Sequence, residues 1–327
     1  MKRLILTSSS GTNLLRAGLA EVIIQFFFRF VWGPLPPPAE FESYFGERSD
    51  QAPGDHWSDW SPWGRWSPDA KARSHLAFVE FRAPYETIEL WFDPDPNDQL
   101  QLIWLLDYFR PLAETAAKLK LRLIDFNLTR LPEEMPEEED VPVVDLSVPE
   151  LETASASWQA YRAKSPQACS DLVHSDLSAF PLLRPTLLDL LRELPSSATG
   201  LGATEMRLLE LIARGYTHAN ELFYLSDLGQ GRIFDAFEIG CLLEGLAHNT
   251  RPAVAGVDDV LRVLEKKNTR FRIEAFRRSR LSLTEFGKAI LAHKEDFSRH
   301  NSIDRWWGGT HLTNDRLWRW SPTLIAP

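Results

Sequence analysis

The sequence has only two cysteines, Cys169 and Cys241, in 327 residues. Two thiols are too few for a disulfide framework or for a zinc site built from cysteine, and they fit a reducing compartment, so we expect a cytoplasmic location. Long apolar runs are also missing. The stretch 22–32 is interrupted by Gln25 and Arg29, and it is shorter than the roughly 20 residues that cross a bilayer. The sequence therefore predicts no membrane-spanning segment.

Positive charge is in deficit, because 36 Lys and Arg residues face 46 Asp and Glu residues and give a formal net charge of −10 at pH 7. Nucleic acids and anionic membranes are bound through positively charged surfaces. The balance argues against extensive binding to either, although a local basic face is compatible with it. With 44% hydrophobic residues, the chain is able to bury substantial cores, and its length predicts two or three domains.

The first part of the chain alternates strand-like and helix-like segments. Apolar segments with strand-like composition occur at 4–7, 21–31, 87–92 and 121–126. This alternation predicts an α/β domain over residues 1–130, with a small, mostly parallel, Rossmann-like sheet. Residues 131–146 follow and begin with LPEEMPEEED, a run that is too polar for a core. We expect an acidic linker there, and an interaction tail is the alternative.

The second part is mostly helical. Residues 147–199 predict a helical connector. Within residues 200–297, the sequence predicts helices at 204–213, 219–225 and 234–247, the two strands of a hairpin at 270–276 and 280–283, and a last helix at 284–293. Three helices followed by a hairpin outline a winged-helix-like domain. The Trp-rich tail, 298–327, is expected to pack back on the protein.

An acidic turn follows the strand at 87–92, where the apolar run ends at DPDPND. In open α/β sheets, ligands bind beyond the carboxyl ends of the strands. Asp93, Asp95 and Asp98 are therefore candidate ligand contacts, and Asp93 and Asp95 are candidate Mg²⁺ ligands. Helix capping is the alternative, with Asp95 as N-cap, Pro96 at the first helical position and Asp98 two residues later.

A turn of small polar residues, SSSGT at 8–12, follows the first strand. Hydroxyls and backbone N–H groups at the start of a helix bind anions, although this turn matches neither the dinucleotide fingerprint nor the P-loop. A plain capped turn is the alternative. If both turns lie at neighbouring strands, Ser8, Ser9, Ser10 and Thr12 would face the aspartates across one crevice, an arrangement that suits a nucleotide or a phosphosugar.

Tryptophans recur at an interval of three in HWSDWSPWGRWSP, as Trp57, Trp60, Trp63 and Trp66. A polyproline-type segment has three residues per turn, which would align the indoles on one edge. The spacing is similar to the ladders of thrombospondin-type repeats, but their cysteine framework is missing. One interpretation is an aromatic platform for a sugar, a peptide or a flipped base. The other is a flap that packs over the sheet.

The tail contains DRWWGGTH at 304–311. Its two glycines permit a close backbone approach. One hypothesis is that the tail reaches the crevice and contributes Arg305 or His311 to a ligand site. The alternative is a brace between domains, anchored by tryptophan, in which Asp304 makes a salt bridge.

Basic residues cluster around the expected hairpin, and they are Lys266, Lys267, Arg270, Arg272, Arg277, Arg278 and Arg280. Such a cluster could lie along phosphates. The expected recognition helix 234–247, however, carries Asp235, Glu238 and Glu244 and no Lys or Arg, so it would be repelled from the major groove. Nucleic acid is therefore the less favoured partner, and winged helices also serve as protein-interaction modules.

Several segments resemble, in order, landmarks of a bacterial family known as domain of unknown function 1835. They are LWFDPDPNDQLQLIWLL, ELPSSATGLGATEMRLLELIARG, LSLTEFGKAILA and IDRWWGGTHL. The resemblance covers nearly the whole chain and implies a two-part cytoplasmic protein, with no established activity. Family members usually have a Gly-Asp-Ser turn where this chain has Thr7-Ser8-Ser9. They also carry a histidine in the acidic turn that is absent here, which weakens a proton shuttle at that position.

We therefore expect a protein that binds, or acts on, a nucleotide-like or phosphorylated small molecule at the carboxyl ends of the N-terminal sheet. Mg²⁺ is a candidate cofactor. A DNA-associated regulator that uses residues 200–297 is one alternative, and a non-catalytic interaction scaffold is the other. A protein partner or a homo-oligomer is compatible with each of these three functions, and no membrane association is expected.

Overall fold

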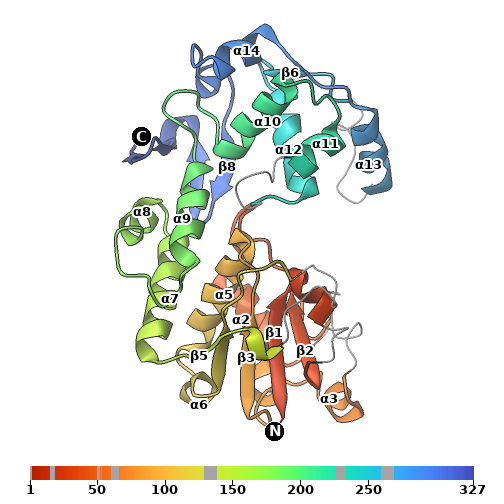
Figure 1. Cartoon of the computed structure of the whole chain (residues 1–327), viewed down its shortest axis with the longest axis vertical. Helices are drawn as coiled ribbons and strands as arrows, with labels where there is room; N and C mark the ends of the chain where they lie inside the picture. The colour runs from red at the N-terminus through yellow and green to blue at the C-terminus, as the bar shows by residue number, and fades with distance from the viewer. Residues whose placement is uncertain are drawn as a thin grey trace. The chain divides into compact units, whose positions relative to one another are not determined.

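The computed structural model describes residues 2–14, 19–49, 52, 54–59, 66–128, 138–225, 233–258 and 269–327. These form two compact units, each built from three stretches of chain (Figure 1). Unit 1 comprises Met1–Phe30, Leu35–Gln159 and Leu177–Leu183. Unit 2 comprises Val31–Pro34, Ala160–Asp176 and Arg184–Pro327. No helix in the described ranges has both the length and the apolar character needed to cross a membrane.

Unit 1 is built on a five-stranded sheet with the order β2-β1-β3-β4-β5. The strands are β1 (Arg3–Ser8), β2 (Val22–Phe26), β3 (Thr87–Trp91), β4 (Leu119–Arg122) and β5 (Val143–Asp145). The first four pair in parallel, and β5 runs antiparallel to β4. Figure 1 shows β2, β1 and β3 side by side. β2 and β3 flank β1 on opposite sides, so the direction in which successive strands are added to the sheet reverses at β1. Open sheets bind ligands in the crevice at such a switch point.

Both faces of the sheet are covered, which explains why every residue of β2 and β3 is buried. Parallel strands buried on two faces have continuous apolar sequences, and this is the pattern that predicted them. The described helices of unit 1 are α2 (Pro38–Phe45), α3 (Pro68–Ala72), α4 (Phe78–Phe81), α5 (Pro96–Phe109), α6 (Ala113–Ala116) and all but the last two residues of α7 (Val148–Tyr161). One face carries an aromatic core in which Phe26 contacts Trp104 of α5 and Phe78 of α4 edge-on, at 5.7 and 6.4 Å. Edge-on packing is the favoured geometry of aromatic pairs.

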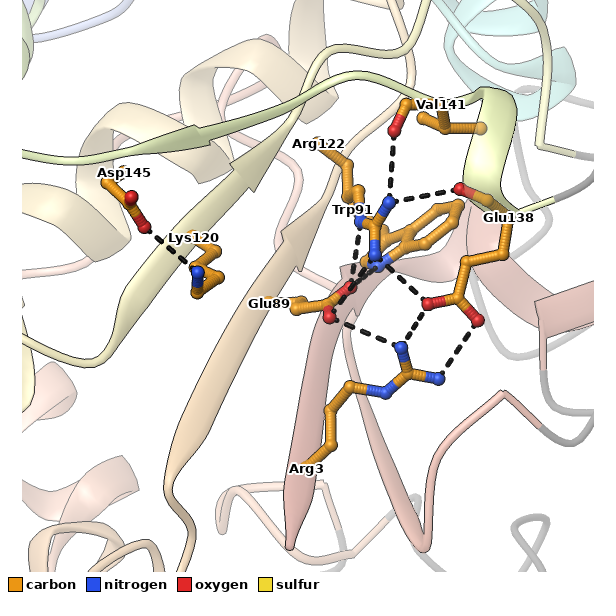
Figure 2. A network of polar contacts seen from close by, with 8 residues as sticks. All are labelled: Arg3, Glu89, Trp91, Lys120, Arg122, Glu138, Val141 and Asp145. Atoms are coloured by element: carbon orange, nitrogen blue, oxygen red, sulfur yellow. Dashed lines mark hydrogen bonds and ion pairs between the residues drawn. The ribbon is translucent and has the colours of Figure 1, made fainter. Parts of the chain in front are cut away.

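The opposite face carries a charged network (Figure 2). An apolar cluster that includes Ile5, Ile23 and Trp91 packs on the same face. Glu89 of β3 accepts hydrogen bonds from Arg122 of β4 at 2.9 Å, from Arg3 of β1 at 3.3 Å and from the indole of Trp91 at 3.0 Å. Arg122 also donates to the carbonyl oxygens of Glu138 and Val141, both at 3.0 Å. These bonds attach the segment before β5 to the sheet.

The interval expected as a linker, 131–146, therefore differs from the expectation in its second half. Residues 138–140 form η4 (Glu138–Asp140), whose Glu138 carboxylate pairs with Arg3 and Arg122, and β5 adds the fifth strand. Residues 131–137 lie outside the described part. An acidic composition predicted exposure to water, but two arginines on the sheet neutralise Glu138, and composition does not reveal those partners.

Two of the four spaced tryptophans, Trp57 and Trp66, lie in the described part. Both are buried in unit 1, with 1% and 3% of their surface exposed, and they stack at 6.2 Å. The indole N–H of Trp57 donates to the carbonyl of Leu76, and that of Trp66 to the carbonyl of Ile23. These two side chains therefore belong to the core and offer no surface platform.

Unit 2 is mostly helical. Its helices are α8 (Gln167–Leu172), α9 (Leu183–Arg192), α10 (Ala203–Ala213), α11 (Ala219–Leu225), α12 (Ala236–Ala247), α13 (Thr269–Arg278) and α14 (Glu285–Leu291), with η6 (Phe297–Arg299) and η7 (Asn314–Arg316). The helices expected near 204–213, 219–225 and 234–247 are confirmed. α12 begins after Asp235, which forms a reciprocal capping box with Glu238. This cap fixes the start of the helix.

The strand expected at 270–276 is wrong, because α13 occupies these residues. The sequence there alternates Arg270, Phe271, Arg272 and Ile273, which resembles a strand. Arg270 and Glu274, however, form an i,i+4 ion pair at 3.3 Å, and such pairs stabilise helices. The strand that does form, β7 (Ser282–Leu283), pairs antiparallel with β6 (Val254–Ala255), and Arg280 makes an isolated bridge with His218.

The Trp-rich tail is ordered as two short antiparallel pairs, although its sequence has little periodicity. β8 (Asp304–Trp307) pairs with β9 (Thr310–Thr313), and β10 (Arg319–Trp320) with β11 (Leu324–Ile325). Gly308 turns the first pair with a φ of +52°, and a Cβ there would lie 2.3 Å from the carbonyl oxygen of Tyr161. Only glycine fits this position, which explains one of the two adjacent glycines.

Candidate functional site

The carboxyl ends of β1 and β3 meet at a cluster of serine and aspartate side chains in unit 1. The Ser8 hydroxyl at the end of β1 donates to the carboxylate of Asp98 in the first turn of α5. The backbone N–H of Ser10 donates to the Ser8 hydroxyl at 3.0 Å. Asp98 is buried, with 3% of its surface exposed. The structure thus brings together Ser8 and Asp98, which lie 90 positions apart in the sequence.

Asp95 is the N-cap of α5, as the capping alternative predicted. Its carboxylate accepts the N–H of Asn97 at 2.9 Å. Burial and the nearby Asp98 raise the pKa of Asp95, whereas the positive charge of Arg29 lowers it. Burial likewise raises the pKa of Asp98, against the lowering effect of the Ser8 hydroxyl. Two neighbouring carboxyl groups that are largely shielded from water cannot both ionise freely, so the pair holds protons at a higher pH than ordinary aspartates.

Asp93 differs from the other two aspartates. Its carboxylate accepts the N–H of Leu128 at 3.2 and 3.3 Å, and its carbonyl oxygen accepts the side-chain amide of Gln99 at 2.7 Å. Only 3% of Asp93 is exposed. Its carboxylate therefore holds the 128 loop, and a ligand contact at Asp93 stays a prediction.

The described residues give no support to the Mg²⁺ expectation for Asp93 and Asp95. Within the described ranges, no group of three or more His, Cys, Asp or Glu side chains is placed to hold a metal ion. The carboxylates of both residues are already used by backbone N–H groups. We therefore assign no metal to this cluster.

The remaining residues of the serine turn lie at the rim of the cluster. Ser9 and Thr12 are exposed and Ser10 is half-buried. The Thr12 hydroxyl donates to the carbonyl of Ser9 at 2.9 Å and accepts the amide of Gln25 at 3.1 Å. The turn is a single 3-10 turn, η1 (Ser9–Asn13), in which Ser8 already caps the N–H of Ser10. Among the described residues, the turn therefore offers a ligand the exposed hydroxyls of Ser9 and Thr12.

Sequence analysis missed two residues beside the cluster. Arg29 is close enough to Asp95 to lower its pKa. Asn97 accepts the N–H of Phe30 at 2.8 Å and donates to the carbonyl of Phe28 at 2.9 Å, which holds the loop that carries Arg29 against α5. Arg29 stands within an apolar run in the sequence, and an isolated charge in such a run was the available signal.

Arg305 and His311 of the tail lie in unit 2, and Asp93 lies in unit 1. Arg305 pairs with Glu205 at 2.9 Å and donates to the carbonyl of Glu193 at 3.3 Å. His311 is exposed, contacts Asp304 at 2.6 Å and stacks on Trp306 at 4.6 Å. The Asp304 salt bridge of the alternative interpretation is thus present as a contact with His311. The crevice expected in unit 1 and a contribution of the tail to it both stay predictions.

The basic cluster in unit 2 is partly neutralised. Arg278 pairs with Asp258 at 2.8 Å and Arg270 with Glu274 at 3.3 Å, whereas Lys266 and Lys267 lie outside the described residues. Paired arginines contribute less to a phosphate-binding surface than free ones. The observed pairs therefore weaken the case for DNA binding.

A scan against protein-family models finds no match for this sequence, and no curated protein matches it. The resemblance to domain of unknown function 1835 therefore stays a prediction. The function is argued below from geometry and charge alone.

Proposed function

We propose that unit 1 binds a nucleotide-like or phosphorylated small molecule at the carboxyl ends of β1 and β3. The observation that carries the proposal is a pair of carboxyl groups at the switch point of the sheet: Asp98, which is buried and bonded to Ser8, and the half-buried Asp95 near it. Carboxyl groups whose pKa is strongly raised by burial are concentrated in functional sites. Capping explains Asp95, but it does not require a second buried carboxyl group next to it.

The chemistry of the rim supports this class of ligand. Asp95 is half-buried and able to accept hydrogen bonds from sugar hydroxyls, and the exposed hydroxyls of Ser9 and Thr12 add further polar contacts. Arg29 provides positive charge close to Asp95, which suits a phosphate group. Beneath the rim, the bonds of Gln25 to the serine turn fix its position, so the site is preorganised.

Calorimetry with AMP, ADP, ATP and ribose 5-phosphate tests this proposal, and each ligand is titrated with and without Mg²⁺. We expect at least one of them to bind and the substitution Asp95→Asn to weaken that binding at least tenfold, about 1.4 kcal/mol. Asparagine is also a good N-cap, so the thermal midpoint of Asp95→Asn should stay close to that of the wild type. Asp69→Asn changes an exposed aspartate in the first turn of α3 and serves as the matched control.

Two results would contradict the proposal. One is that no compound of the panel binds at millimolar concentration. The other is that Asp95→Asn binds as tightly as the wild type and the Asp69→Asn control. A loss of binding together with a large drop in the thermal midpoint would assign Asp95 to capping alone.

We also propose a winged-helix-like arrangement for α10 to β7, with DNA association as the second candidate function. The support is the pairing of β7 with β6 and the bridge from Arg280 to His218 after three helices. α13 takes the place of the expected hairpin strand, and α12 begins with an acidic capping box, which disfavours a major-groove contact. A gel shift with random duplex DNA over a salt series decides the point, because phosphate-mediated binding must weaken steeply with salt. Absence of a shift at low salt would exclude this function.

A further inference from the structure

We propose that unit 2 contains a second binding site, for a small uncharged aromatic molecule of one or two rings. The site is a cavity of about 190 Å³. Its aromatic and acidic lining includes Trp32, Tyr161, Glu193, Phe234, Trp306 and Trp307. All of these residues belong to unit 2, so the inference is independent of the function proposed for unit 1.

The size of the cavity limits the ligand. An apolar cavity of about 150 Å³ lined by aliphatic and aromatic side chains admits benzene. A cavity of about 190 Å³ therefore has room for one ring with substituents or for two small fused rings. Nucleotides and larger cofactors exceed this space.

The walls favour a planar aromatic ligand. Trp32 and Phe234 pack edge-on at 5.6 Å, and Tyr161 and Trp307 contact each other at 5.2 Å. A ring that enters between such side chains finds further stacked or edge-on partners. Aromatic side chains are the usual lining of small-molecule pockets.

The walls are also held in place by hydrogen bonds. The indole N–H of Trp307 donates to the carbonyl of Leu190 at 2.6 Å, and Gly309 donates to the carbonyl of Tyr161 at 2.9 Å. Trp306 is 37% exposed and stacks on His311, so it lies where the cavity meets solvent. A rigid lining lowers the entropic cost of ligand binding.

The charged groups around the cavity are satisfied without a ligand. Arg305 pairs with Glu205 at 2.9 Å. The Asp304 side chain is 79% exposed and contacts His311, so solvent screens its charge. An ionic ligand would bury a charge without a free counter-charge, which is unfavourable, and this is the reason for inferring an uncharged one.

Glu193 carries a reduced negative charge at neutral pH and little at low pH. It is buried directly after α9, and its carboxyl group accepts the hydroxyl of Thr204 in α10 at 2.6 Å. Burial raises the pKa of Glu193 to about 7, despite the bond from Thr204. A partly protonated Glu193 is compatible with a neutral ligand and attracts a cation less than an ordinary ionised glutamate would.

Three compounds that share one ring system test the charge preference on the full-length protein: indole, cationic tryptamine and anionic indole-3-carboxylate. We expect calorimetry to show binding of indole, at least tenfold tighter than that of either charged compound. Equal or tighter binding of tryptamine would assign the cavity to cation recognition by aromatic faces and would overturn the proposal. So would the absence of indole binding at millimolar concentration.

Variants locate the binding. Trp306→Ala removes a wall of the cavity, whereas Trp320→Ala removes a half-buried tryptophan of the same unit that does not line it. Leu242→Phe adds volume to the lining from α12 and provides a second variant if Trp306→Ala folds poorly. We expect at least a tenfold loss of indole affinity for Trp306→Ala and Leu242→Phe and no change for Trp320→Ala. Equal affinities across all variants, or an equal loss in Trp320→Ala, would show that indole binds elsewhere and would overturn the assignment.

Discussion

Buried carboxyl groups in this protein have pKa values set by their immediate neighbours, and the two units show opposite outcomes. In unit 1, burial by itself would raise the pKa of Glu89, but bonds from Arg122 and Trp91 together with the charge of Arg3 lower it. In unit 2, the described bonds to the Glu193 carboxyl group come from Thr204, and burial outweighs these bonds and the lowering effect of the Arg305 charge. A guanidinium in direct contact therefore decides the protonation state of a buried acid here.

Glu193 predicts a dependence of stability on pH. Its pKa is raised from 4.5 to about 7, so the folded state holds the proton more tightly than the unfolded state does. Its contribution to the free energy of unfolding is then fully present below pH 4.5 and is lost as the pH rises through 7. We expect wild type to lose on the order of 2 kcal/mol relative to Glu193→Gln between about pH 5 and pH 8.

Urea unfolding at both pH values measures this difference. Glu285→Gln, which changes a glutamate with an 89% exposed side chain in the same unit, is the control. Parallel pH profiles for wild type and Glu193→Gln would show that Glu193 is ionised in the folded protein over the whole range.

At the scale of single residues, the sequence located the acidic turn but could not assign its members. Asp95, Pro96 and Asp98 follow from local capping rules, and Asp95 is the N-cap. The role of Asp93 depends on Leu128, and that of Asp98 on Ser8. These partners come from distant segments, so no local pattern carries them.

At the scale of secondary-structure elements, the charged network holds four segments of unit 1 together. Arg3, Glu89, Arg122 and Glu138 come from β1, β3, β4 and η4. Strand register places the side chains of Arg3, Glu89 and Arg122 on one face of the sheet. Ile5, two residues after Arg3, is opposite Glu89, and Glu89 is opposite Lys120, two residues before Arg122. Once the register is known, the alternation of side chains predicts the face, but the sequence alone does not provide the register.

The substitution Glu89→Gln tests the network. It leaves Arg3 and Arg122 without a central carboxylate, and breaking a buried pair in this way costs about 3 kcal/mol or more. Asp145→Asn changes an 82% exposed carboxylate that pairs with Lys120 on the same face, where we expect a change within about 0.5 kcal/mol. Urea midpoints measure both effects. Similar midpoints for the two variants would mean that solvent already screens Glu89.

At the scale of the whole molecule, the α/β class was predictable, because buried parallel strands have continuous apolar sequences. The division of the chain into its two units was not predictable from composition. Composition predicted contiguous blocks, with a boundary near 130, whereas each unit contains three stretches that alternate along the chain. Proline and acidic residues indicate where a chain is solvated locally, but they do not indicate where it returns to an earlier core.

This alternation predicts which fragment folds. A fragment of residues 1–130 lacks β5, Glu138 and Trp158, whose indole contacts Phe30 at 4.9 Å. It also leaves the edge of β4 unpaired, which favours aggregation. A fragment of residues 1–183 contains every stretch of unit 1.

We expect the fragment 1–183 to unfold cooperatively in urea, as followed by far-UV circular dichroism, and the fragment 1–130 to aggregate or to unfold without a sharp transition. A cooperative transition of 1–130 at the same midpoint would show that the sheet is complete without β5 and α7. The boundary near 130 that composition predicted would then be the correct one.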